Sequence, residues 1–186
     1  MKKAQGSLVL IILLIIGFAI ELVTGSAGNE AALLKLGGLP DNGELHGEYW
    51  RIATYSFLHF SWLHLIVNVS LLLWIGRIVE RQVGTTQAML IYFASSAVLI
   101  LMVHNWNPKA GATVGASGGI FGLLGAALII SCQQKGDDRL RRRLWTALLV
   151  GFAVSLFPGI SMAGHAGGIV GGGLMALLVK IRMNES

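Results

Sequence analysis

The sequence Gly115-Ala116-Ser117-Gly118-Gly119 begins an apolar run that continues to Cys132. A serine among glycines is weak evidence by itself, because small residues are common wherever membrane helices pack closely. Its place at the start of an apolar segment is more informative. The first backbone N–H groups of a helix have no partner within the helix, and the helix dipole there favours negative charge. Ser117 is therefore a candidate nucleophile, and its own N–H could hold the oxyanion of a tetrahedral intermediate.

The composition is that of a membrane protein. Of the 186 residues, 54% are hydrophobic and 12% are charged, whereas about 25% of the residues in a soluble domain are charged. The single cysteine, Cys132, excludes an internal disulfide bond and a cysteine-based metal site.

Six apolar segments approach the length of about 20 residues that a spanning helix needs. The first follows Lys2 and Lys3, as a signal peptide would, but no clear cleavage site comes after it, so we expect a retained helix. We predict an all-α membrane protein forming a single domain over residues 1–186. Its spanning helices are expected at residues 7–23, 62–79, 85–103, 117–132, 144–157 and 160–181.

The basic residues predict the orientation in the membrane. With both termini in the cytoplasm, eleven lysines and arginines lie on the inner side, and Lys35, Arg51 and Lys109 lie on the outer side. This asymmetry explains the net charge of +5 without nucleic acid as a partner. The cluster from Arg139 to Arg143 is expected to lie on anionic lipid headgroups.

The segment between the first two predicted spans, residues 24–61, is too long for a bare loop. Its apolar clusters are separated by glycine and proline. We expect it to fold partly as short helices and to lie at the outer interface of the membrane.

Few strongly polar residues fall inside the predicted spans, and each such residue is a functional candidate. His64 and Asn68 lie near the start of the second span, Ser117 at the start of the fourth, and His165 near the start of the sixth. These three helices all begin on the outer side, so the four side chains reach a similar depth. None of the nine acidic residues lies in a span at the level of His165. We therefore predict a dyad of Ser117 and His165, with the histidine as general base and then general acid.

His64 and Asn68 are four residues apart and share one face of a helix. Their side chains could donate hydrogen bonds to the oxygen that the Ser117 N–H binds, and one such donor contributes about 10²–10³ in rate.

Small residues recur every fourth position on two helices, which lets backbones approach closely. Packed face to face, the two stripes are expected to bring Ser117 Oγ within hydrogen-bond reach of His165. The stripes consist of Gly118, Gly122 and Ala126 on the fourth helix, and of Gly164, Gly168 and Gly172 on the sixth.

The fourth helix is short, so Ser117 is expected below the outer interface, with residues 107–114 dipping inward as irregular chain. At the inner end of the second helix, Arg77 and Glu80 are spaced for a structural ion pair.

Taken in order, these motifs resemble the rhomboid family of intramembrane serine proteases. The resemblance extends from about Gly47 to Gly172. It is carried by Tyr49-Trp50-Arg51, His59, His64-x-x-x-Asn68, Gly76-x-x-x-Glu80-x-x-x-Gly84, Gly115-Ala116-Ser117-Gly118, and His165 followed by Gly168 and Gly172.

The resemblance implies a bundle of six transmembrane helices with a membrane-embedded first outer loop. Ser117 would be the nucleophile and His165 the base, while His64, Asn68 and the Ser117 backbone would form the oxyanion hole. Phe121 stands where some relatives carry a tyrosine stacked on the catalytic histidine, and it would keep the stacking without the hydroxyl.

The resemblance also implies roles around this centre. Trp50 and Arg51 would help to hold the first outer loop in the membrane. For His59, just outside the second span, we expect a structural role, in which its hydrogen bonds fix that loop. The fifth helix, with the loop that ends at Phe157-Pro158-Gly159, would be the substrate gate. No cofactor or metal is implied, and the site does not require an oligomer. The expected partners are transmembrane protein substrates and the lipid bilayer of a bacterial plasma membrane, with the active site open to the outer side.

Three other hypotheses remain open at this stage. A small transporter or channel could use the same polar groups, although the spans have no acidic residue and no paired broken helices. A metal site could be built from His59, His64 and His165. A noncatalytic relative could bind membrane proteins without cleaving them.

Overall fold

Helices make up most of the chain in the computed structural model. The structure describes residues 5–42, 44–106, 111–134, 138–157 and 160–179, with residues 103–106 described by their backbone alone. The helical elements are α1 (Gln5–Thr24), α2 (Glu30–Leu36), α3 (Arg51–Thr54), the 3-10 turn η1 (Tyr55–Phe57), α4 (Trp62–Leu71), the π-helical turn η2 (Leu72–Gly76), α5 (Arg77–Val83), α6 (Thr85–Trp106), α7 (Ser117–Gln133), α8 (Asp138–Val154) and α9 (Met162–Leu178).

Three described helical segments are long and apolar enough to cross a membrane: Gln5–Thr24, Trp62–Val83 and Thr85–Met102. The second of them runs through α4, η2 and α5 without a break. Helices α7 and α9 are apolar but have 17 residues each, which corresponds to about 25 Å. The predicted all-α membrane fold is therefore confirmed in its class, while the number of six spans stays a prediction.

Helix α8 begins earlier than expected. Its start was predicted at Leu144, yet the helix includes the charged residues from Asp138 onward and ends at Val154. Hydropathy marks where a helix is apolar, and it misses polar turns that continue the same backbone hydrogen bonding. Helix α9 begins at Met162, because Ser161 accepts a hydrogen bond from the Gly164 N–H at 3.0 Å and caps the helix.

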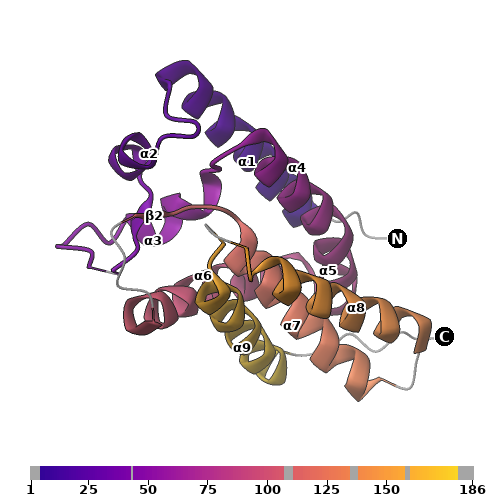
Figure 1. Cartoon of the computed structure of the whole chain (residues 1–186). Helices are drawn as coiled ribbons and strands as arrows, with labels where there is room; N and C mark the ends of the chain where they lie inside the picture. The colour runs from indigo at the N-terminus through magenta and orange to yellow at the C-terminus, as the bar shows by residue number, and fades with distance from the viewer. Residues whose placement is uncertain (1–4, 43, 107–110, 135–137, 158–159, 180–186) are drawn as a thin grey trace.

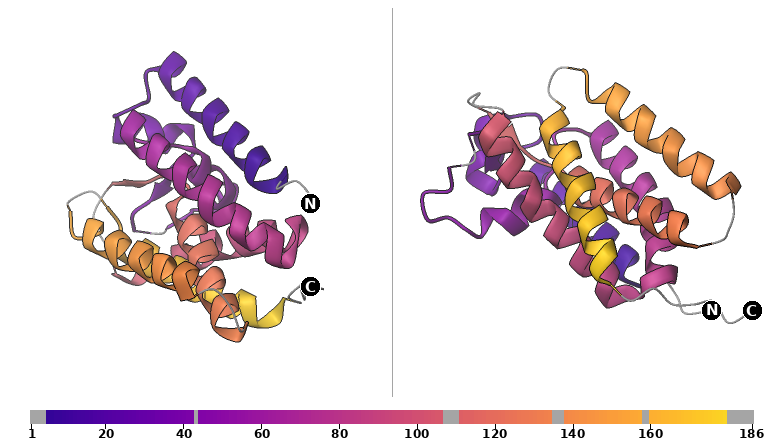
Figure 2. Two further views of the ribbon diagram at one scale, coloured as in Figure 1. Left: turned by 90° about the vertical axis from the view of Figure 1, so that its right-hand side faces the viewer. Right: turned by 90° about the horizontal axis from the view of Figure 1, so that it is seen from below.

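Helix α7 lies at the centre of the bundle. It packs against α6 and α9, while α1 lies beside α4 (Figure 1). Most of its residues are buried, as expected for a helix that is apolar on all sides. Helix α8 lies at the periphery, where its contacts are mainly with α7 (Figure 2). Among the described residues of α8, only Leu144 is buried. This helix is thus the least enclosed of those around the candidate site.

Glycines bring α7 and α9 into backbone contact. An added Cβ atom on Gly172 would overlap the backbone of Gly122, and one on Gly168 would overlap the carbonyl oxygen of Gly118. This part of the predicted glycine packing is confirmed. The predicted pairing of the two stripes is wrong in one respect, since the Cβ directions of Gly118, Gly122 and Gly164 face α6. The stripes thus join three helices, because α6 packs into the angle between α7 and α9.

Glu80 has a different partner from the predicted one. Its carboxylate accepts hydrogen bonds from the backbone N–H groups of Gly6 and Ser7, at 2.8 and 3.1 Å, and from the hydroxyls of Ser7 and Thr85. The ion pairs of the described residues do not include one with Arg77, so the predicted Arg77–Glu80 pair is wrong. A carboxylate at the start of α1 satisfies N–H groups that the helix leaves unpaired, and it joins this helix to α5.

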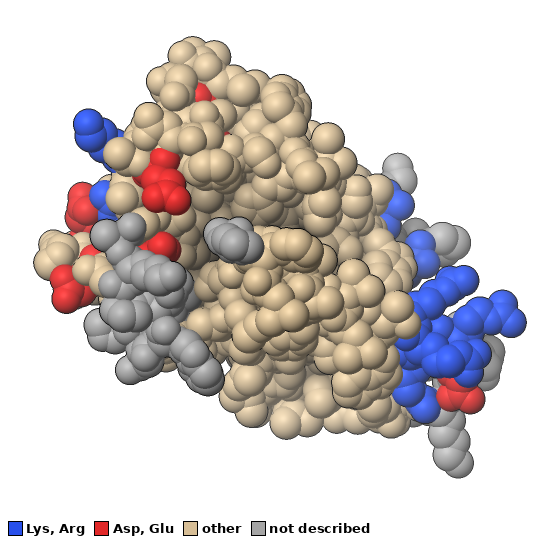
Figure 3. Space-filling model, in the orientation of Figure 1, with Lys and Arg blue, Asp and Glu red and all other residues tan. Residues whose placement is uncertain are grey.

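Charged residues gather at two ends of the molecule. Figure 3 shows lysines and arginines near the start of α8, and most aspartates and glutamates at the opposite end, near α2 and α3. The surface between the two ends is largely uncharged in this view. This arrangement suits a protein whose middle lies in hydrocarbon.

Candidate active site

Ser117 is the first residue of α7, and the loop before it is anchored to the first outer loop. Strands β1 (Leu39–Pro40) and β2 (Ala112–Thr113) form a short antiparallel pair. The Gly115 N–H then donates a hydrogen bond to the Tyr55 carbonyl oxygen at 3.0 Å. Gly115 has a φ of 122°, a conformation that side chains strongly disfavour. Of the segment expected to dip inward as irregular chain, residues 107–110 lie outside the described residues, Ala112 and Thr113 form strand β2, and Gly111 and Val114 belong to no helix or strand.

An aspartate strengthens this connection. The Thr113 hydroxyl donates a hydrogen bond to Asp41 Oδ1 at 2.5 Å. Burial raises the pKa of Asp41, the hydrogen bond from Thr113 opposes this, and the nearby Glu30 raises the pKa further. The pair lies outside the membrane-spanning segments and fixes the direction from which the chain reaches Ser117.

His64 and Asn68 both point at this approach to Ser117. A Cβ atom built on Gly115 would lie 2.7 Å from His64 Nε2 and 3.8 Å from Asn68 Nδ2. Asn68 is 2% exposed, and its Nδ2 has no hydrogen-bond partner among the described residues. A buried amide donor without a partner is costly, so its direction toward the serine loop suits a role in binding an oxygen of the substrate.

The imidazole ring of His165, a residue of α9, lies in the core. It is 7% exposed and stacks on Phe121, with ring centroids 3.9 Å apart and an angle of 6° between the planes. The predicted stacking of Phe121 on this histidine is confirmed. The backbone contact between Gly118 and Gly168 places Ser117 and His165 on neighbouring turns of closely packed helices.

The predicted hydrogen bond between Ser117 Oγ and His165 is not among the bonds that the described residues form. The ring instead forms a hydrogen bond with Ser155, whose Oγ lies 2.6 Å from His165 Nδ1. Ser155 follows the last residue of α8 and is 4% exposed. No motif in the sequence indicates this serine, because its contact with His165 depends on the position of the end of α8 relative to α9. Hydrogen bonds of catalytic groups are often long without substrate, so the Nε2 side of His165 remains the candidate base.

Arg51 holds the first outer loop together. Its Nη1 donates hydrogen bonds to the carbonyl oxygens of Leu34 and Gly38, and its Nε pairs with Glu48 at 2.8 Å. The guanidinium also lies 4.7 Å from the ring centroid of Trp50, within the range of cation–π attraction. The side chain of Arg51 thus connects α2 to α3 in this loop.

His59 acts through its backbone rather than through its ring. Its N–H donates to Glu21 Oε1 at 2.8 Å, and both ring nitrogens lack hydrogen-bond partners among the described residues. The expected support of the first outer loop by hydrogen bonds of His59 is therefore found at its backbone, which joins the end of this loop to α1. Burial, with a smaller contribution from His64, lowers the pKa of His59 to about 3, so this ring is neutral. It packs edge-on against His64, with the centroids 5.0 Å apart.

Glu21 is an acidic residue that the sequence placed at a helix end without a role. It lies inside α1 and is completely buried. Its carboxylate binds the backbone of His59, and no hydrogen bond joins it to His165 in the described structure. Within the described residues, no group of three histidine, cysteine, aspartate or glutamate side chains is arranged to hold a metal ion.

The predicted gate contacts the candidate site through few side chains. Phe121 meets Phe152 of α8 edge-on at 6.4 Å, and a Cβ atom on Gly151 would lie 2.5 Å from the Phe121 ring. Ser155 provides the polar contact. Pro158 and Gly159 of the predicted gate loop lie outside the described residues.

Comparison with known proteins shows similarity to rhomboid proteins. A sequence profile described as the Rhomboid domain matches residues 46–182. The rhomboid protease GluP of Bacillus subtilis is 33% identical over 170 residues, which are 87% of this chain and 32% of GluP. The RHOMBOID-like protein 1 of Arabidopsis thaliana is 32% identical over 83% of this chain and 41% of its own length. The rhomboid protease GlpG of Haemophilus influenzae is 28% identical over 85% of this chain and 84% of its own length. The chain thus spans less than half of the length of the first two relatives.

Proposed function

The chain belongs to the rhomboid family of integral membrane proteins, and we propose that it is a serine endopeptidase that cleaves transmembrane segments of other membrane proteins. The proposal rests on the convergence of the candidate side chains on the loop that precedes Ser117. His64 and Asn68 point at Gly115, two residues before Ser117, while His165 lies on the helix packed against α7. A nucleophile at a helix N-terminus, with side-chain donors and a histidine nearby, is the arrangement that acyl transfer needs.

In the proposed reaction, Ser117 Oγ attacks the carbonyl carbon of the scissile peptide bond, and His165 Nε2 takes its proton. The developing oxyanion accepts hydrogen bonds from the Ser117 N–H, Asn68 Nδ2 and the His64 ring. His165 then gives the proton to the leaving amine. Water, with the same histidine as base, hydrolyses the acyl-enzyme.

We place the start of α8 and both chain termini in the cytoplasm and open the site to the outer side of a bacterial plasma membrane. The charge distribution supports this orientation, because the basic end of the molecule (Figure 3) matches the side on which loops are rich in lysine and arginine. A substrate helix would enter beside α8, since this helix has the fewest buried residues of those that contact the site.

Covalent labelling tests the proposed function. A fluorophosphonate probe is expected to modify the purified protein, and mass spectrometry is expected to find the adduct on Ser117. Ser131 is the matched control, because it lies on the same helix and its hydroxyl is bound to the Leu128 carbonyl oxygen at 2.8 Å. Ser131→Ala should label like the parent, and Ser117→Ala should not label. Equal labelling of Ser117→Ala and the parent would refute the proposed nucleophile.

A further inference from the structure

The hydrogen bonds around Ser155 determine which nitrogen of His165 carries the proton. Ser155 Oγ lies 2.7 Å from the Gly151 carbonyl oxygen and 2.6 Å from His165 Nδ1. A carbonyl oxygen only accepts, so the single hydroxyl proton of Ser155 is donated to Gly151. The oxygen of Ser155 must then accept from His165, and Nδ1 carries the proton. The lone pair of a neutral ring is left on Nε2, the form that a general base needs.

We propose that Ser155 is a positioning residue that fixes this tautomer of His165. The inference rests on the proposed function, in which Nε2 accepts the proton of Ser117. It also ties the base to α8, because Ser155 and Gly151 both lie at the outer end of that helix and its following turn. An outward movement of α8 to admit a substrate would break the hydrogen bond to Nδ1 and leave the ring only its stacking on Phe121. The same helix that would admit the substrate thus holds the base ready.

The test uses nitrogen NMR of the histidine ring together with kinetics. In the parent, the His165 signals, assigned with His165→Gln, should show a protonated Nδ1 and an unprotonated Nε2. Ser155→Ala should remove this preference and lower kcat about tenfold with little change in KM. Ser155→Thr keeps the hydroxyl and should restore both the tautomer and most of kcat.

Ser95 provides the matched control. Its hydroxyl donates to the Ile91 carbonyl oxygen at 2.6 Å in a buried helix, as Ser155 does with Gly151, but among the described residues it makes no hydrogen bond with a histidine. Ser95→Ala should leave the ring signals unchanged. An unchanged His165 tautomer in Ser155→Ala would overturn the inference. Measuring the tautomer in Ser117→Ala as well separates it from the proposed function, because the hydrogen bond does not need an active nucleophile.

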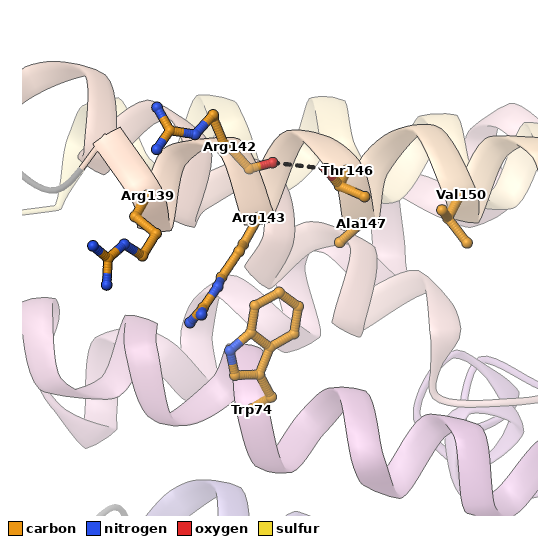
Figure 4. A pocket seen from close by; sticks show the side chains of 7 residues that line it. All are labelled: Trp74, Arg139, Arg142, Arg143, Thr146, Ala147 and Val150. Carbon is orange, nitrogen blue, oxygen red and sulfur yellow. Dashed lines mark hydrogen bonds between the residues drawn. The ribbon is translucent and has the colours of Figure 1, made fainter.

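A second, independent observation concerns a groove at the basic end of the molecule. A cavity of about 480 Å³ lies between η2 and α8. Figure 4 shows Arg143 extending from α8 toward Trp74 on the opposite side. Further along α8, the wall becomes apolar. The groove is lined by Trp74, Arg139, Arg142, Arg143, Thr146, Ala147 and Val150.

Two polar groups on opposite sides of this groove could both donate hydrogen bonds to one anion. The indole of Trp74 and the guanidinium of Arg143 can donate hydrogen bonds but have no atom that accepts one. The two groups therefore cannot form a hydrogen bond with each other. The Thr146 hydroxyl is already bound to the Arg142 carbonyl oxygen at 3.0 Å. Asp138, which does not line the groove, pairs with Arg141 at 3.2 Å. A phosphate oxygen placed between Trp74 and Arg143 would accept from both sides of the groove.

We infer that the groove binds an anionic phospholipid, with its phosphate between Arg143 and Trp74 and an acyl chain along Ala147 and Val150. Arginine pairs well with phosphate through two parallel donors. The charged end of the groove lies at the end of the molecule that would face the inner headgroups. Its apolar end would lie toward the hydrocarbon of the membrane. A bound lipid would connect α8 to the helix on the other side of the gap.

Fluorescence quenching tests the lipid site in full-length protein reconstituted in vesicles. Brominated phosphatidylglycerol should quench the Trp74 signal, taken as the difference from Trp74→Phe, more strongly than brominated phosphatidylcholine. Arg143→Gln should weaken the preference for phosphatidylglycerol about fivefold. Arg81→Gln is the control, because Arg81 is exposed at the end of α5 and does not line the groove. Equal quenching by the two lipids would overturn the inference. So would displacement of the lipid by inorganic phosphate alone, because the acyl chain would then have no role.

Discussion

Replacing Gly115 with alanine is expected to reduce peptide cleavage by at least about 10²-fold, the effect of losing one oxyanion donor. The added methyl group would lie 2.6 Å from His64 Cε1 and 2.7 Å from its Nε2, closer than real contacts allow. The imidazole must move away from the serine loop, or the loop must move away from Tyr55. Either movement separates the groups that would bind the oxyanion. The measurement is kcat/KM on a model transmembrane substrate, with thermal unfolding followed in the same detergent.

Gly47→Ala is the control for this prediction. Gly47 also has a positive φ, of 87°, but an added Cβ atom there meets nothing within 4 Å. It should lose stability from backbone strain alone, by about 1 kcal/mol, and keep its activity. Gly115→Ala activity close to that of Gly47→Ala would contradict the role given to this contact.

The second large effect is expected at the contact between α7 and α9. Gly172→Ala should destabilise the protein by about 1–3 kcal/mol, as overpacking does, and should lower activity, because α9 carries His165. The added Cβ atom would overlap the backbone of Gly122, and backbone atoms of a helix cannot turn aside as a flexible side chain can. The melting temperature and the cleavage rate are the two measurements.

The adjacent glycine gives a matched comparison for this substitution. A Cβ atom on Gly173 would make only an ordinary contact of 3.7 Å with Ile129. Gly173→Ala should therefore be neutral or stabilising by up to about 1 kcal/mol, the difference in helix propensity. Equal melting temperatures for the two variants would show that the close contact at Gly172 does not limit the packing.

The sequence predicted the helices well wherever apolar residues alone define them. The segments predicted at residues 7–23, 85–103 and 117–132 agree with α1, α6 and α7 to within a few residues. The prediction missed the first turns of α8, residues 138–143, because they are charged and hydropathy does not detect them. It also missed the pairing of β1 with β2, since two residues on each side leave no periodic pattern.

The residues of the candidate site could be predicted from the sequence, but most of the contacts between them could not. Polar residues inside apolar helices are rare enough to be conspicuous, so His64, Asn68, Ser117 and His165 could be selected from the sequence. The stacking of Phe121 on His165 was predicted and is confirmed. The part played by Ser155 was not predictable, because one serine near a helix end looks like many others.

By itself, the sequence determined the class of the protein, the position of most helices and the polar residues that are candidates for chemistry. These properties are local, because the cost of placing a polar group in hydrocarbon depends on the residue and its immediate neighbours. The tertiary structure alone decided the partners: Glu80 binds the start of α1 rather than Arg77, Gly118 faces α6, and Ser155 binds His165. Partners are chosen by the way in which whole helices pack, and a few ångströms of displacement between helices change them without any change in the pattern of hydrophobic residues.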